Sequence, residues 1–258
     1  MRDYWIAGLT ISGTKSVIGM SGIEIVGFLC DQDGRRPEPR KVQRILDWPV
    51  PGSTRDARAF IGVIVYYRIF ILDFAIVAAP IFALFRKGKR FIWTDDCQTA
   101  MDTLKTKITE APVLVSVDFS ASALPIFLNV DASTTVGWGA VLSQQQEDGR
   151  LHPARYESGI WSDVERKYDA LKLECRGLLK SLKKIRFWLF GRYFTVQTDS
   201  QALVWLLNQP PNDLPNAMMT RWLTYIRLFD FDVKHVPGNK NGAADSLSRR
   251  GKGPGRCR

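Results

Sequence analysis

The spacing of hydrophobic positions divides the chain into a helical block and a block rich in strands. Between residues 37 and 115, apolar residues recur at helical spacing, as at Met101, Leu104 and Ile108. From about residue 122, short apolar runs alternate with turn signals, which is typical of strands. In this second block we expect strands over residues 124–130, 139–142, 152–156, 193–198 and 229–236.

Capping and proline signals set the limits of the predicted helices. Pro39 can begin a helix that stops before Pro49, and Ser53 and Thr94 suit the N-cap position of two more helices. In the second block we expect helices over about residues 162–187, 201–208, 216–228 and 243–249.

The order of these elements predicts an α/β (α+β) fold. Three strands in succession suggest an antiparallel meander, and the later alternation with helices suggests parallel additions. We therefore expect a mixed five-stranded sheet flanked by helices and preceded by a small helical domain. Residues 23–30 also have strand character, and 31–34 carry a turn signal.

Four acidic residues follow predicted strands or lie within predicted helices: Asp131, Glu174, Asp199 and Asp245. Apolar or small residues flank each of them, and an unpaired carboxylate is costly in such surroundings. If the strands before Asp131 and Asp199 are neighbours, these two carboxylates share one sheet edge, at which Glu174 and Asp245 can point. Clustered carboxylates repel one another unless cations neutralise them, and oxygen ligands suit Mg²⁺ or Mn²⁺. The pattern favours phosphodiester hydrolysis by two metal ions roughly 4 Å apart.

Each acidic residue also has a plain structural interpretation. Asp131 can be a strand-end turn residue, Glu174 an exposed helical residue and Asp199 a helix N-cap. Asp245 can lie on the surface of the last helix.

The net charge of +10 over 258 residues favours a nucleic-acid partner, although a merely soluble basic protein is the alternative. The basic segment after Glu174 has two equally good explanations: it can be the solvent-exposed face of a helix, or it can contact nucleic acid. The aromatic residues Trp188, Tyr193, Trp205 and Trp222 fit the core better than stacking platforms. The candidate nucleic-acid contacts are Lys183, Lys184, Arg186, Arg192 and Lys240.

The four cysteines are widely spaced and form no C-x-x-C pair, which argues against a zinc site or a disulfide framework. A reducing, intracellular compartment fits this usage. Arg68, Asp73 and Pro80 interrupt the longest apolar stretch, residues 59–84, so we expect packed helices and no membrane partner.

Residues 122–249 resemble the ribonuclease H domain of reverse transcriptases from gypsy-type LTR retroelements. Residues 37–115 resemble the thumb of these polymerases through segments 45–49 and 60–71, and residues 1–36 resemble the end of the palm. The matching stretches of the ribonuclease H part are Val130-Asp131-Ala132-Ser133, residues 137–144, Glu165-Arg166-Lys167-Tyr168, and residues 194–199, 203–208, 236–241 and 244–249. The domains expected from this likeness are a palm remnant (1–36), a thumb-like region (37–115), a ribonuclease H-like domain (116–249) and a disordered basic tail (250–258).

The resemblance implies that Asp131, Glu174, Asp199 and Asp245 hold two Mg²⁺ or Mn²⁺ ions. One ion would activate a water and the other would stabilise the leaving 3′ oxygen, so that the RNA strand of an RNA–DNA hybrid is cut. It also implies association with the remaining polymerase domains or homodimerisation, in a cytoplasmic virus-like particle or the nucleus.

Three departures from the family pattern stand out. The polymerase motif Tyr/Phe-x-Asp-Asp is absent, so we expect no DNA synthesis. Residues 93–96 (Trp-Thr-Asp-Asp) are similar to it, but they fit the start of a helix better. Loop 238–242 lacks the histidine that many ribonucleases H carry, and His235 precedes that loop. Lys172 stands where related elements usually have an acid.

Two other functions remain open at this point. The chain can be a catalytically inactive nucleic-acid-binding remnant of a degraded retrotransposon. A weaker alternative is an integrase or transposase of similar fold.

Overall fold

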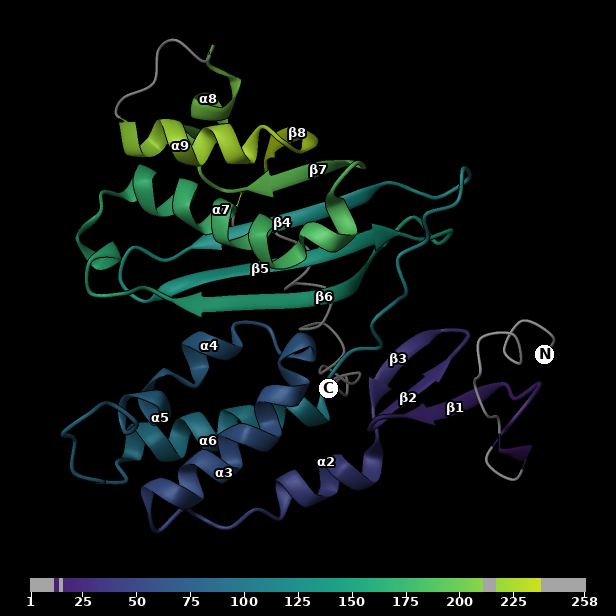
Figure 1. Ribbon diagram of the computed structural model, residues 1–258, viewed down its shortest axis with the longest axis vertical. Coiled ribbons are helices and arrows are strands. Elements are labelled where there is room, and N and C mark those ends of the chain that lie inside the picture. The colour runs from purple at the N-terminus through teal and green to yellow at the C-terminus, as the bar shows by residue number, and fades with distance from the viewer. Residues whose placement is uncertain (1–11, 14–15, 211–216, 238–258) are drawn as a thin grey trace, which may run out of the picture.

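The computed structural model describes residues 12–13, 16–210 and 217–237. A small antiparallel sheet leads into a group of helices, and a larger mixed sheet with its own helices follows (Figure 1). The predicted helix at 243–249 and the predicted disorder at 250–258 lie outside the described residues.

The small sheet consists of β1 (Gly22–Ile25), β2 (Phe28–Asp31) and β3 (Gly34–Pro37), paired in that order. The strand-like run 23–30 is a hairpin, because the chain reverses at Val26 and Gly27, whose φ angles are 50° and 83°. Positive φ at both central residues is what a tight hairpin turn requires. The turn expected at 31–34 is confirmed.

The helical region follows the capping signals. The Ser53 side chain accepts a hydrogen bond from the Asp56 amide, and that of Thr94 accepts one from the Cys97 amide. The acidic pair after Thr94 is therefore the first turn of a helix, as predicted. The elements are α2 (Pro39–Leu46), α3 (Thr54–Ile64), the 3₁₀ helix η2 (Val65–Phe70), α4 (Phe74–Val77), α5 (Ala79–Ala83) and α6 (Asp95–Thr109).

The large sheet has the strand order β6-β5-β4-β7-β8. Strands β4, β5 and β6 form the expected antiparallel meander, and β7 and β8 add in parallel. The fold class predicted from the sequence is confirmed. The strands are β4 (Ile126–Ala132), β5 (Gly137–Gln145), β6 (Leu151–Ile160), β7 (Tyr193–Thr198) and β8 (Asp230–His235).

Helices α7 (Ala170–Leu189), α8 (Gln201–Asn208) and α9 (Ala217–Ile226) share one hydrophobic core with the sheet. From β4, Leu128 and Val130 belong to this core. The helical region packs on the other face, where Val141 of β5 and Tyr156 of β6 join its core. Figure 1 shows the sheet between these two groups of helices. The helical region and the large sheet share buried surface, and this contact does not mark where one domain ends. The predicted domain boundaries stay a prediction.

The helix expected over 162–187 begins later than predicted. A short 3₁₀ helix, η3 (Glu165–Lys167), comes first, and Tyr168 is extended. The Asp169 side chain then caps α7 by accepting a hydrogen bond from the Lys172 amide.

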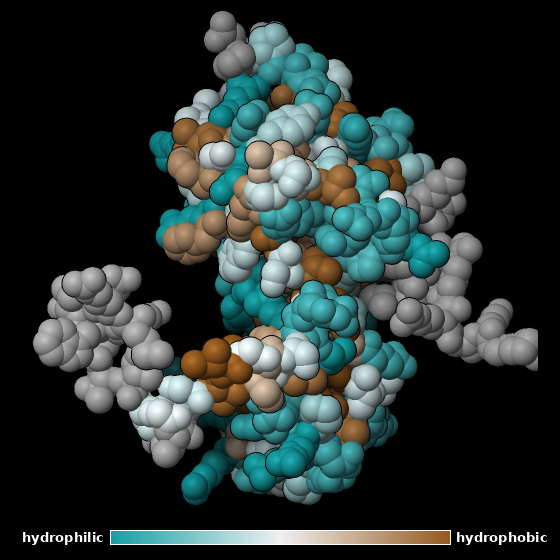
Figure 2. Space-filling model, turned by 90° about the vertical axis from the view of Figure 1, so that its right-hand side faces the viewer, coloured by the Kyte–Doolittle hydropathy of each residue, from teal (hydrophilic) through white to brown (hydrophobic). Residues whose placement is uncertain are grey.

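The surface corrects the expectation that four aromatic residues lie in the core. Trp222 is 9% exposed and Trp188 packs against the core, but Trp205 is 60% and Tyr193 58% exposed. Hydrophobic and hydrophilic patches alternate over the face in Figure 2. In the part of the chain that the structure describes, every helix is too short or too polar to cross a membrane.

Candidate active site

The pairing of β4 with β7 brings two of the acidic residues to one place. Asn129 is paired with Gln197, and the Asn129 amide donates a hydrogen bond of 2.9 Å to the Gln197 side chain. Side chains alternate along a strand, so residues two positions further on lie on the same face. Asp131 and Asp199 are those residues, at the carboxyl ends of two parallel neighbouring strands.

Glu174 comes to these carboxylates from the first half of α7. Its Oε2 atom is buried and has no hydrogen-bond partner among the described residues. Burial first, and then the charges of Asp199 and Asp131, raise the pKa of Glu174 to about 8. The three carboxylates are therefore close enough to repel one another, in surroundings that disfavour charge.

The same cluster of acidic residues affects Asp131, whose side chain is exposed to solvent. Burial and the neighbouring Asp199 raise the pKa of Asp131, and a hydrogen bond from the Ala132 amide opposes them. The N-cap of α8 is Ser200, whose side chain accepts a hydrogen bond from the Leu203 amide. Asp199 does not serve as that cap. Its carbonyl oxygen lies 3.1 Å from Nε2 of His235, at the end of β8.

A glycine in the middle of α7 allows the helix to approach β4 closely. A Cβ atom added at Gly177 would lie 3.2 Å from the Cβ of Ala132 and 3.5 Å from that of Trp138. Ala132 directly follows Asp131, so this contact holds α7, and with it Glu174, at the end of β4.

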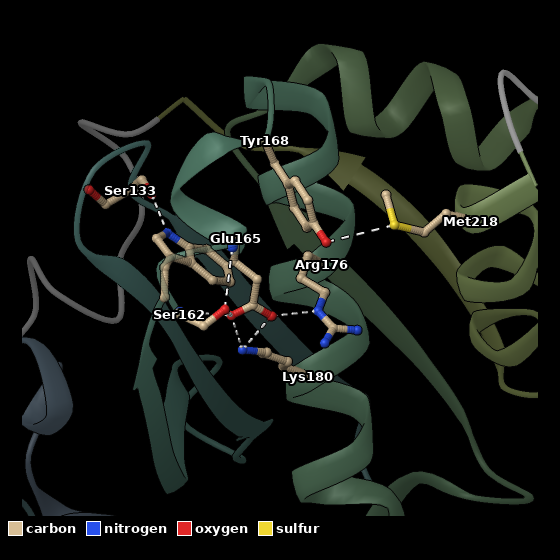
Figure 3. Close-up of polar contacts among 8 residues, drawn as sticks. Ser133, Ser162, Glu165, Tyr168, Arg176, Lys180 and Met218 are labelled. Carbon is tan, nitrogen blue, oxygen red and sulfur yellow. Dashed lines mark hydrogen bonds and ion pairs between the residues drawn. The ribbon is translucent and has the colours of Figure 1, made fainter.

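Glu165, which precedes α7, is joined to the middle of that helix by a polar network that the sequence did not assign (Figure 3). Its carboxylate accepts hydrogen bonds from the Ser162 amide and hydroxyl, and from Arg176 and Lys180 at 2.8 Å each. Burial alone would raise the pKa of Glu165, but the Lys180, Ser162 and Arg176 hydrogen bonds lower it to about 2. The spacing Ser162-x-x-Glu165 is a capping-box signal that could have identified it.

Trp161 extends this network towards the candidate site. Its ring Nε1–H donates a hydrogen bond of 2.7 Å to the carbonyl oxygen of Ser133, two residues after Asp131. The turn that follows β4 is thus tied to the segment that leads into α7.

The donor set fits a divalent cation in its chemistry. All the ligands would be carboxylate oxygens, and Oε2 of Glu174 is buried with no hydrogen-bond partner among the described residues. Within the described ranges, however, no three His, Cys, Asp or Glu side chains lie close enough to hold one ion. Binding therefore requires that side chains rotate or that Asp245 takes part. Asp245 and Lys240 lie outside the described residues.

The candidate nucleic-acid contacts that the structure describes lie away from the carboxylates. Arg186 follows Glu174 by twelve residues on α7, which corresponds to about 18 Å along the helix. The Nζ atom of Lys183 lies 5.1 Å from the centre of the Tyr225 ring, and the Cζ atom of Arg192 lies 4.3 Å from the centre of the Phe119 ring. Lys172, the departure from the family pattern, forms an ion pair with Asp169.

Comparison with known sequences and structures identifies relatives for most of the chain. Residues 93–196 match a family described as the RNase H-like domain found in reverse transcriptase. The Tf2-3 and Tf2-4 transposon polyproteins of Schizosaccharomyces pombe are each 30% identical over 245 residues, which is 94% of this chain. The chain spans only 18% of the length of these polyproteins.

Two solved structures share the fold at low sequence identity. The foamy viral protease-reverse transcriptase dRH in complex with double-stranded DNA has a TM-score of 0.71 at 19% identity, over 91% of this chain and 41% of its own. The foamy viral protease-reverse transcriptase in complex with an RNA/DNA hybrid has a TM-score of 0.69 at 20% identity, over 88% and 31%.

Proposed function

We propose that the chain is the part of a retrotransposon reverse transcriptase that contains the RNase H-like domain, and that it hydrolyses the RNA strand of RNA–DNA hybrids. The match of residues 93–196 to that domain and the similarity of most of the chain to transposon polyproteins support this proposal. The observation that carries the proposal is the gathering of Asp131, Glu174 and Asp199 at one edge of the sheet. Three mutually repelling carboxylates are costly to fold, and cation binding is the use that offsets this cost.

Two Mg²⁺ or Mn²⁺ ions would be held by Asp131, Glu174 and Asp199, with Asp245 as the fourth acidic residue. When bound, such ions lower the pKa of a water and stabilise negative charge on phosphate oxygens. Hydrolysis forms a bond from the water oxygen to phosphorus and breaks the bond to the 3′ oxygen.

The protein's own part in this reaction is to place negative charge. The sheet fixes Asp131 and Asp199 at adjacent strand ends, and α7 delivers Glu174 from its side. The high pKa of Glu174 means that a bound cation must displace a proton in neutral solution. Cation affinity should therefore rise with pH.

An RNA–DNA hybrid is the proposed substrate, and further contacts with nucleic acid would be non-specific. The net charge of +10 supports an anionic polymer as partner. One relative in fold is a reverse transcriptase in complex with an RNA/DNA hybrid. We also propose association with the remaining polymerase domains, or a homodimer, as the assembled form.

A cleavage assay tests the proposal directly. The full chain is incubated with Mg²⁺ and a hybrid carrying labelled RNA, beside double-stranded DNA and double-stranded RNA of the same sequence. We expect cleavage of RNA in the hybrid alone, about 100-fold or more above Asp131→Asn, because that change removes one charged ligand. Equal product from the two proteins would refute a nuclease at this site.

A binding remnant without activity is the second candidate. It is favoured by the lack, within the described residues, of three side chains close enough to hold one ion. The same samples decide between the two, since a remnant binds hybrid tightly with no turnover at any Mg²⁺ or Mn²⁺ concentration.

A further inference from the structure

Asp73 is an acidic residue of the helical region with an unusual backbone conformation. It lies between η2 and α4, and its φ of 58° is in the left-handed region. Burial raises the pKa of its carboxyl, Lys107 of α6 lowers it, and Asp131 of the large sheet raises it again. Asp73 therefore lies within electrostatic reach of the candidate site, although it comes from another part of the fold.

The Asp73 carboxylate occupies the space that a side chain at position 139 would need. A Cβ atom added at Gly139 would lie 2.4 Å from Oδ1 of Asp73, closer than any real contact. Gly139 is the register partner of Asp131 in the pairing of β5 with β4. Residues directly opposite each other in paired strands have side chains on the same face. Asp73 and Asp131 consequently lie on the same face of the sheet. Asp73 belongs to the helical region that packs on this face, and Asp131 belongs to the sheet itself.

A hydrogen bond beside Asp73 fastens the helical region at this point. The amide of Ala75 donates to Oγ of Ser158 at 2.9 Å. Ser158 of β6 is paired with Gly139 of β5. The contact therefore lies in the same row across the sheet as Gly139 and Asp131, which keeps the Asp73 carboxylate in place.

We propose that Asp73 is a further acidic residue of the candidate nuclease site, contributed by the helical region, whose negative charge strengthens the binding of divalent cations at Asp131. This inference rests on the proposed function and adds a charge that the four acidic residues of the ribonuclease H-like part do not include. Coulomb attraction gives the sign, because a nearby negative charge stabilises a bound cation. The competing explanation is conformational, since Asp and Asn both tolerate a left-handed backbone.

The variant Asp73→Asn separates charge from conformation, because Asn keeps the shape and the tolerance for positive φ. Mn²⁺ binding to the full chain is measured by isothermal titration calorimetry without nucleic acid. We expect affinity to fall about five- to tenfold, the order of a unit charge acting on a divalent ion at about 7 Å in watery surroundings. The matched control is Asp102→Asn on the exposed face of α6, which should leave affinity unchanged. Unchanged affinity in Asp73→Asn would overturn the proposal.

A second variant keeps the test decisive if Asp73→Asn folds poorly. Asp73→Gly also tolerates the left-handed backbone and removes the charge, so Mn²⁺ affinity should fall by the same roughly five- to tenfold. A rise or no change would contradict the proposal. Asp131→Asn serves as the reference for the proposed function itself. If it leaves Mn²⁺ binding intact, the nuclease site fails, whereas loss in Asp131→Asn but not in Asp73→Asn rejects only the role of Asp73.

Discussion

At the scale of single residues, the carboxyl group of Glu174 carries the largest electrostatic cost in the candidate site. Its pKa of about 8 arises from burial together with two neighbouring acids, and its Oε2 atom is unpaired among the described residues. A side chain that only supported the helix would gain stability as an amide or an apolar group. The cost therefore has a measurable signature in stability.

We predict that Glu174→Gln stabilises the cation-free protein, and more so at high pH. The folded-state pKa lies above the ordinary value of 4.5, so the folded protein binds more protons between these two values and loses stability as pH rises. Allowing for solvent screening, the gain should be about 1–2 kcal/mol at pH 8 and close to zero at pH 4.5. Urea unfolding at the two pH values, in the presence of a chelator, measures it. A variant that is less stable than the parent at pH 8 would speak against electrostatic strain at Glu174.

At the scale of elements, the position of α7 decides whether Glu174 reaches the strand ends. Two features set this position: the close contact at Gly177 and the Glu165 network with Arg176 and Lys180. Glu165 is nearly buried, and its pKa of about 2 shows that its charged form is well satisfied. Loss of one partner from such a network leaves the others without compensation.

We predict that Glu165→Gln destabilises the protein by about 2–3 kcal/mol at neutral pH. Because the folded-state pKa is depressed, this stability is present above pH 4.5 and is lost as pH falls towards 2. The difference in unfolding free energy between parent and variant should therefore shrink below pH 4. Activity on a hybrid should also fall, since α7 loses its anchor. The idea is wrong if the difference is the same at pH 3 and pH 7.

The sequence predicted some elements well because local signals agreed with tertiary packing. The strand Tyr193–Thr198 and the helix Gln201–Asn208 have the predicted limits, since the strand-like run stops before Asp199 and Ser200 caps the helix. The order of elements allowed the strands before Asp131 and Asp199 to be neighbours without requiring it, and the pairing of β4 with β7 makes them so.

Other features depended on contacts that the sequence does not display. Strand β5 is buried on both faces along most of its length, so it lacks alternation, and only residues 139–142 were recognised. The Gln144 side chain of this strand donates to the carbonyl oxygens of Asp118 and Leu124, contacts that no local pattern in the sequence displays. The approach of Asp73 to Gly139 joins residues far apart in the chain, and only the packing of the helical region on the sheet reveals it.

At the scale of the whole molecule, helices cover both faces of the large sheet. The helical region buries Val141 and Tyr156, and the Arg35 guanidinium donates a hydrogen bond of 3.1 Å to the Ala154 carbonyl oxygen. The ribonuclease H-like part therefore relies on the preceding residues for one of its faces.

We predict that a chain beginning at residue 116 is less stable than the full chain and binds more of a hydrophobic dye. Removing the helices exposes the apolar side chains of β5 and β6 that they cover, and such patches promote association. Thermal unfolding and dye fluorescence of the two proteins measure the effect. The prediction fails if the shortened chain unfolds at the same temperature without dye binding.

The central claim is that Asp131, Glu174 and Asp199 converge to hold divalent cations. The most direct measurement is anomalous diffraction from a crystal of the full chain soaked in Mn²⁺. The account predicts manganese peaks about 2.2 Å from carboxylate oxygens of these three residues, with the Glu174 Oε2 atom among the ligands. Peaks only elsewhere on the surface, with the three carboxylates bare at saturating Mn²⁺, would contradict it.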